Sequence, residues 1–241
     1  MCEKCATTGR TSLSRRGFVT GIAGLAAASM ALPGLAMAEE SGTPQNAISP
    51  SDALKRLLEG NERYASNKAE PRDNSAGRAA RTLGQHPIAA ILSCADSRVA
   101  PELAFDQGPG DLFVVRVAGN IVSPDGLASL EFGVKFLSTP LVMVLGHTSC
   151  GAVNAAISTV RDDAVLPGHL PGLINGIEPA VIAAKANDPK DLLAEATKEN
   201  VRLTQKALVK GSAIIAEAAD AGRIEIVGGV YDLATGRVAM L

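Results

Sequence analysis

From residue 88 onwards, short apolar runs alternate with segments of helical periodicity, and this alternation constrains the fold more than any other feature of the sequence. Each run has the length and composition of a buried strand. Strands joined through helices run parallel, and the helices cover both faces of the sheet. The predicted strands are Ile88–Ser93, Leu112–Val117, Leu141–Leu145, Ile224–Val230 and Arg237–Leu241. The last two are close enough for a hairpin, so we predict an α/β fold with a mostly parallel sheet and an antiparallel C-terminal edge.

Helical windows separate these runs, at Pro101–Asp106, Ser123–Leu137, Gly151–Val160, about 173–185 and about 189–220. A further helix opens at Pro50, where Ser51 or Asp52 can cap it, and it carries an apolar stripe on one face made of Leu54, Leu57, Leu58 and Tyr64. This amphipathic helix needs a surface to pack on, in its own subunit or in another.

The first 38 residues differ from the rest of the chain. Paired arginines, Arg15 and Arg16, precede an uncharged stretch from Phe18 to Ala38 that ends in an A-x-A pattern. This is typical of an export signal, and S-R-R-x-F resembles the twin-arginine type. We therefore expect a signal (residues 1–38), a flexible leader (39–48) and one domain (49–241), with the protein exported to the periplasm or outside the cell. The alternative is a membrane anchor that is never removed.

Composition excludes several classes of function. Hydrophobic residues make up 46% and charged residues 20% of the chain, and the net charge is −2, as in ordinary soluble domains. There is no basic stripe with interleaved aromatics, so we expect no nucleic-acid partner. We also expect no stable membrane association once the signal is removed.

Two cysteines and one histidine stand where the predicted strands end. Cys94 follows the first strand, His147 follows the third, and Cys150 lies three residues further on. The carboxyl ends of parallel strands meet at one edge of a sheet, so these residues can converge. Two thiolates and one imidazole are zinc ligands, and three protein ligands leave a position open for water, which is typical of catalysis. The alternative is a Cys94–Cys150 disulfide in an exported protein.

Asp96 and Arg98 lie next to Cys94 in the same predicted loop. Their spacing allows a carboxylate–guanidinium pair, which would keep Asp96 ionised beside the metal. An ionised carboxylate can accept a hydrogen bond from a hydroxide at the metal and so orient it. A surface ion pair without function is the alternative.

Together, Cys94-x-Asp96-x-Arg98 and His147-x-x-Cys150-Gly resemble the metal motifs of the β-class carbonic anhydrases. The resemblance extends from about Ser51 to Leu241. Other segments that carry it are Leu58–Tyr64, Asp111–Arg116 with Ala118–Asn120, Glu131–Val134, and Val227–Asp232 with Thr235-Gly236.

The resemblance implies a zinc lyase, a carbonate dehydratase, that reversibly hydrates carbon dioxide to bicarbonate and a proton by attack of zinc-bound hydroxide. Cys94, His147 and Cys150 match the zinc ligands, and Asp96 with Arg98 matches the pair that orients the hydroxide.

The resemblance also implies a substrate pocket and an oligomer. Gln85 matches a glutamine that contacts substrate across a dimer interface, and Phe113 matches a pocket aromatic. Phe132 stands where the family has tyrosine, and Ala118 where it often has valine. We expect a homodimer or a higher even oligomer in which the N-terminal helix packs on a partner subunit.

Two other functions remain possible at this point. A relative on the same scaffold could hydrolyse carbonyl sulfide or carbon disulfide with the same residues. Alternatively, the chain could be a non-enzymatic exported domain held by a Cys94–Cys150 disulfide.

Overall fold

A computed structural model describes residues 48–75 and 77–241, which form an α/β fold around one five-stranded sheet. The strands are β1 (Ala89–Ser93), β2 (Leu112–Arg116), β3 (Leu141–His147), β4 (Glu225–Tyr231) and β5 (Val238–Met240). Their order in the sheet is β2-β1-β3-β4-β5. The first four run parallel and β5 pairs antiparallel with β4, so the predicted sheet and its antiparallel edge are confirmed.

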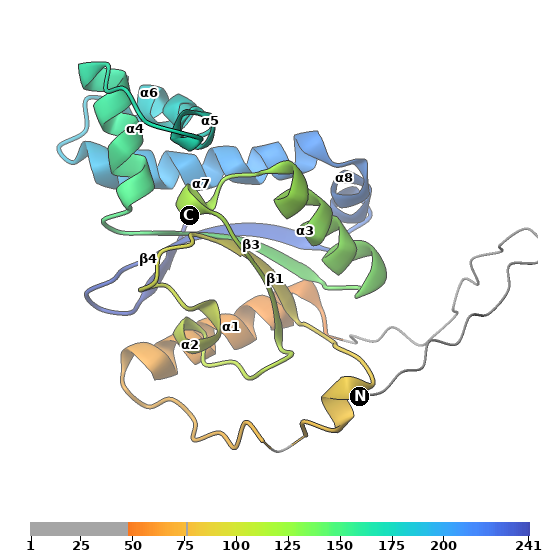
Figure 1. Ribbon diagram of the computed structural model, residues 1–241. Coiled ribbons are helices and arrows are strands. Elements are labelled where there is room, and N and C mark those ends of the chain that lie inside the picture. The colour runs from red at the N-terminus through yellow and green to blue at the C-terminus, as the bar shows by residue number, and fades with distance from the viewer. Residues whose placement is uncertain (1–47, 76) are drawn as a thin grey trace, which may run out of the picture. The chain divides into compact units, whose positions relative to one another are not determined.

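Helices cover both faces of this sheet (Figure 1). One face carries α1 and α2, and the other carries α3, α7 and α8. The bounds are α1 (Pro50–Ala65), α2 (Pro101–Ala104), α3 (Pro124–Phe136), α4 (Gly151–Asp162), α5 (Leu170–Ile174), α6 (Glu178–Lys185), α7 (Leu192–Gly211) and α8 (Ala213–Asp220), with 3₁₀ turns η1 (Ala80–Thr82) and η2 (Ala118–Asn120). Among the described residues, no helix is both long and apolar enough to cross a membrane.

Alternate residues of the central strands supply the two halves of the core. Ile91 of β1 packs in the cluster under α1, whereas its neighbour Leu92 packs in the cluster under α3 and α7. Both are almost completely buried, as expected for a strand that is covered on both faces. A third cluster joins α4 and α6 around Cys94 and Cys150.

Three local predictions were wrong. The helix expected over about 173–185 is two helices, α5 and α6, separated by a turn at residues 175–177. The helix expected over about 189–220 is two helices, because the chain turns at Ser212, whose backbone is extended and whose hydroxyl caps α8 by accepting from the Ile215 N–H. The first helix is capped by Ser49, which accepts from the Asp52 N–H, and neither Ser51 nor Asp52 is the cap residue. Both Ser49 and Ser212 accept from a first-turn N–H that has no acceptor within its own helix, and each therefore marks a helix start.

The apolar stripe of α1 packs on its own subunit. Ala53 and Leu57 are fully buried against the sheet, and Leu54 and Tyr64 are partly buried at the margin of the same cluster. A partner subunit could therefore contact only the part of α1 that is not buried in its own core. Packing of α1 on a partner stays a prediction.

Gly60 lets α1 approach the end of α2 very closely. A methyl group at this position would overlap the backbone carbonyl of Phe105, which cannot move as a flexible side chain could. Asn61 then reaches the Ala104 carbonyl at 2.8 Å and the Gly236 carbonyl at 2.8 Å. The close contact thus fixes α1 against two separate segments of the chain.

We expect Gly60→Ala to lower the free energy of unfolding by about 2 kcal/mol, because overpacking outweighs the better helix propensity of alanine. Urea denaturation measures this change. Glu59→Ala is the control, since Glu59 is exposed on the same helix. Equal stability of the two variants would contradict the close contact.

Candidate metal centre

The parallel register brings Cys94, His147 and Cys150 together. Ser93 of β1 lies beside Leu145 of β3, so the residue that follows β1 is adjacent to the end of β3. Cys150 is the residue that precedes α4. The Sγ atoms of the two cysteines and a ring nitrogen of His147 all lie within 4.8 Å of one another, and all three residues are buried.

The hydrogen bonding of His147 leaves one ring nitrogen available for a metal. Its Nδ1 lies 2.9 Å from the Thr148 carbonyl, which can only accept, so Nδ1 carries the proton of the neutral ring. Its Nε2 is buried and has no hydrogen-bond partner. A buried acceptor without a partner is costly, and a bound cation would satisfy it. This arrangement fits the expected zinc site.

The two cysteines are free thiols, so the disulfide alternative is wrong. The hydrogen bond from the Cys150 thiol lowers the pKa of Cys94 to about 4, against the opposing effect of burial. The same hydrogen bond, together with burial, raises the pKa of Cys150. The pair therefore holds a proton between two buried sulfurs, and a divalent cation can replace that proton.

The charge of this cluster also acts on the imidazole. Burial lowers the pKa of His147, but the negative charge of Cys94, the hydrogen bond to the Thr148 carbonyl and the charge of Asp96 outweigh burial, and the net pKa is raised. The site thus attracts positive charge when it holds none. A dication bound to Nε2 would supply that charge in place of a proton.

A second layer of hydrogen bonds holds the Cys94 sulfur. The Gly119 N–H donates to Cys94 Sγ at 3.2 Å, and the Asn200 side chain donates to the Gly119 carbonyl at 2.7 Å. Gly119 has φ +72°, and a side chain there would meet Ile177 Cδ1 at 2.5 Å. Asn200 lies on α7 far along the chain, so no sequence pattern indicates its role and only the packing of α7 on the sheet reveals it.

The end of β4 holds the loop that contains His147. The Thr148 N–H donates to the Tyr231 carbonyl at 2.9 Å, and the Thr148 hydroxyl accepts from the Leu233 N–H at 3.0 Å. The Thr148 carbonyl, which fixes the His147 ring, is therefore itself fixed by the neighbouring strand.

Asp96 and Arg98 form the expected pair at the edge of the cluster. Arg98 donates from Nε to Oδ1 at 2.9 Å and from Nη2 to Oδ2 at 2.7 Å, and its N–H also donates to Oδ1 at 2.9 Å. These bonds hold the pKa of Asp96 well below its usual range, despite the opposing effect of burial. Asp96 Oδ2 lies 3.8 Å from His147 Nε2, so an ionised carboxylate faces the metal position.

Arg116 at the end of β2 fixes the loop between Cys94 and Asp96. Its Nε donates to the Cys94 carbonyl at 3.1 Å, and its Nη2 donates to the Asp96 carbonyl at 2.6 Å. No pattern in the sequence indicates this role for Arg116. A planar guanidinium can hold two carbonyls at once, so the loop has a defined shape.

The four expected substrate-binding residues separate into two places. Ala118 begins η2 and lies beside Gly119 at the cluster. Gln85 is exposed and precedes β1, whereas Cys94 follows it. Phe113 pairs with Ala90 near the start of β1, and its ring stacks on Phe132 with centroids 6.4 Å apart. Gln85, Phe113 and Phe132 therefore lie at the opposite end of β1 from the metal ligands of their own chain.

A family model described as carbonic anhydrase matches residues 89–238. The chain is 40% identical over 192 residues to carbonic anhydrase 2 of Mycobacterium tuberculosis, a match that covers 79% of this chain and 92% of that relative. The chain belongs to the β-class carbonic anhydrase family. The carbonic anhydrase of Pseudomonas aeruginosa is 36% identical over 65% of this chain and 74% of its own length.

Solved β-carbonic anhydrases share the fold. The structure of the β-carbonic anhydrase CcaA has a TM-score of 0.61 at 27% identity and covers 78% of this chain and 87% of its own. The Coccomyxa β-carbonic anhydrase, solved in complex with acetazolamide, has a TM-score of 0.59 at 29% identity, with 78% and 86% covered. The family resemblance seen in the sequence is confirmed, and zinc is the metal of this β-carbonic anhydrase.

We expect Asn200→Ala to weaken zinc binding about tenfold, because the turn that donates to the Cys94 sulfur loses its support. Competition with a chromophoric chelator measures the affinity. Thr197→Val is the matched control, since Thr197 is buried on the same helix and its hydroxyl bonds only the Leu193 carbonyl within α7. Equal affinities for the two variants would show that Asn200 does not support the site.

Proposed function

We propose that this protein catalyses the reversible hydration of carbon dioxide to bicarbonate and a proton, with zinc held by Cys94, His147 and Cys150. The single observation that carries the proposal is the buried, unpartnered Nε2 of His147 beside two free thiols. Two thiolates and an imidazole are a zinc ligand set, and three protein ligands leave a fourth position for water. Family membership supplies the class of reaction.

Zinc held by these residues would supply an acidified water as the nucleophile for CO₂. The protein supplies the orientation. Asp96 is kept ionised by Arg98, so it would accept a hydrogen bond at the open position and orient the nucleophile toward substrate. Arg116 and the Gly119 N–H hold the backbone and the sulfur on either side, so little reorganisation is needed during the reaction.

A hydrolase of carbonyl sulfide or carbon disulfide would use the same residues. The curated relatives described above are named carbonic anhydrases, which favours carbon dioxide as substrate. Assays with the three substrates separate these functions.

We expect the wild-type protein to contain about one zinc per chain and to hydrate CO₂. His147→Ala should lower zinc affinity and activity by ~100-fold or more, because it removes a metal ligand and not only a residue that supports one. Metal analysis and stopped-flow hydration measure both. His169→Ala is the control, since His169 is exposed and precedes α5. Removal of zinc with a chelator should abolish activity, and added zinc should restore it.

Two results would contradict this assignment. Wild-type activity that survives complete removal of zinc would exclude the metal mechanism. Bound zinc without CO₂ hydration would favour the sulfur-containing substrates.

We also infer that the active protein is a homodimer or a higher even oligomer in which Gln85, Phe113 and Phe132 serve the metal centre of a second subunit. Their distance along β1 from their own cluster supports this, since one chain alone does not bring them to the metal ligands. Phe132 is 46% exposed and Phe136, whose ring is tilted against it, is 60% exposed, as suits an interface. Two β-carbonic anhydrases of Sordaria macrospora are described as tetrameric. One solved chain of them is 25% identical to this chain, with a TM-score of 0.61, and the match covers 79% of this chain and 97% of its own.

Mixing two inactive variants tests the shared site. Cys94→Ser removes a metal ligand, and Gln85→Ala removes the donated side chain. A mixed dimer has one complete site, because the Cys94→Ser chain donates an intact Gln85 to the intact cluster of its partner. We expect subunits exchanged at a one-to-one ratio to regain about a quarter of wild-type activity. If Gln85 served its own cluster, each mixed dimer would have no complete site, and activity would not return.

We further propose export through the twin-arginine-type segment, with cleavage near Ala38. The sequence of residues 1–38 supports this proposal. These residues lie outside the described part of the chain, and so do residues 39–47 of the expected leader. The expected domain begins at residue 49, one residue before α1.

A further inference from the structure

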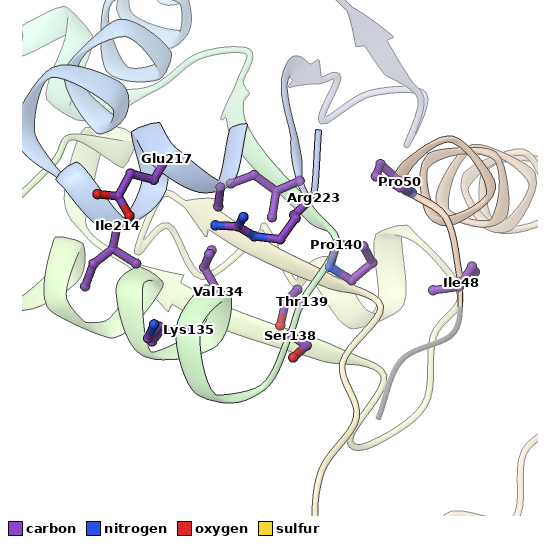
Figure 2. Close-up of a pocket in the computed structure, with 12 residues that line it drawn as sticks. Ile48, Pro50, Val134, Lys135, Ser138, Thr139, Pro140, Ile214, Glu217 and Arg223 are labelled. Atoms are coloured by element: carbon purple, nitrogen blue, oxygen red, sulfur yellow. The ribbon is translucent and has the colours of Figure 1, made fainter. Parts of the chain in front are cut away.

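A cavity of about 580 Å³ lies where β3 and β4 begin, at the opposite end of the strands from the metal ligands. Pro140 lines it directly before β3, whereas His147 is the last residue of that strand. Figure 2 shows side chains from α3, α8, the start of α1 and the turn before β4 around it. Its volume is in the range of small-molecule sites.

The lining combines apolar side chains with three charged ones. Ile48, Val134, Pro140, Ile214 and Ile224 form apolar walls contributed by separate segments. The charged side chains are Lys135, Glu217 and Arg223, so the local charge is net positive. Such a lining suits a ligand with one anionic group and an apolar body.

The three charged side chains make no ion pair with one another. Within residues 48–75 and 77–241, no salt bridge or side-chain hydrogen bond involves Arg223, Lys135 or Glu217. In Figure 2 the Arg223 side chain extends over Val134 in the direction of Ile214. Arg223 is exposed, and its N–H donors have no side-chain acceptor among the described residues.

The backbone presents Arg223 in a fixed position. Its N–H donates to the Ala218 carbonyl at 2.9 Å and so closes the end of α8, and Ile224, which follows it, is buried at the start of the sheet. Across the base of the cavity, the Glu225 N–H donates to the Pro140 carbonyl at 3.0 Å. A ligand that binds Arg223 would therefore order little more than the side chain itself.

A buried hydroxyl without a partner lies in the wall of the cavity. Thr139 lines the cavity and is completely buried, and its Oγ1 has no hydrogen-bond partner. Its backbone is held, because the Thr139 N–H donates to the Gly133 carbonyl at 3.1 Å. Because no surface of Thr139 is accessible to solvent, a ligand atom reaches this hydroxyl only where the neighbouring side chains move aside.

We propose that this cavity binds a small amphipathic organic carboxylate. Its carboxylate pairs with the Arg223 guanidinium, with Lys135 adding positive charge, and its hydrocarbon part packs on the apolar walls. Glu217 at the margin disfavours a second negative group, so a monocarboxylate is preferred to a dicarboxylate. The site is separate from the metal centre and does not depend on the proposed hydration activity.

Titration calorimetry of octanoate into the zinc-loaded, full-length protein tests the proposal. We expect saturable binding to one site per chain, with 1-octanol about tenfold weaker because it lacks the charge. Arg223→Gln should weaken octanoate binding about tenfold, and Glu217→Gln should strengthen it several-fold, because the two substitutions change the local charge in opposite directions. Arg161→Gln is the control for loss of a surface arginine, since Arg161 pairs with Asp162 on α4.

Three outcomes would overturn the proposal: no saturable binding, equal affinities for octanoate and octanol, or equal effects of the Arg223 and Arg161 substitutions. In the first case Arg223 and Lys135 only offset the negative ends of α8 and α3. Cys94→Ser should bind octanoate as the wild type does. Failure of the zinc chemistry and failure of this site are therefore distinguishable.

Discussion

The parallel pairing of β1 with β3 is the constraint on which the metal centre depends. Residues far apart in the sequence meet because Ser93 and Leu145 are partners in the sheet, and each strand then delivers its next polar residue to the same edge. A shift of one residue would turn the following side chains to the other face of the sheet. The fully buried, apolar β1 and β3 resist such a shift, since either face would then lose its packing. The stability of the core and the geometry of the site therefore have the same origin.

The energetic problem at this edge is the burial of two sulfurs and an imidazole. The protein does not solve it with a counter-charge of its own, because the Arg98 guanidinium is committed to Asp96. It provides weak partial charges instead, such as the Gly119 N–H on Cys94. The remaining negative charge is the property that makes the site select a dication. The same reasoning explains why Asp96 can stay ionised beside a thiolate: its own charge is neutralised by Arg98 before it faces the cluster.

Much of this could be predicted from the sequence, for physical reasons that also set the limit. The strands are buried on both faces and leave continuous apolar runs, and the three ligands follow strands whose ends must meet. Asn200 could not be found in this way, because its role arises from how α7 crosses the sheet and no periodicity records that. The break at Ser212 was missed for a different reason: helical periodicity continues across it, and only the capping hydrogen bond of its hydroxyl distinguishes two helices from one. Long-range packing and local capping by serine are both invisible to apolar patterns.

The position of α1 bears on how a second subunit can bind. Its most buried residues, Ala53 and Leu57, contact the chain's own core, and Gly60 sets a close approach to Phe105 that a partner could not share. The surface of α1 that remains available to a partner is therefore its charged outer face together with partly buried residues such as Leu58. The exposed rings of Phe132 and Phe136 lie on α3, on the opposite face of the sheet. An interface that brings Phe113 and Phe132 to another metal centre would have to be formed around the β2 edge, because β2 is the outer strand and Phe113 lies on it. The edge of a parallel sheet presents unpaired N–H and C=O groups with which another chain can pair, so a second chain bound there would cover the edge and complete the site in one step.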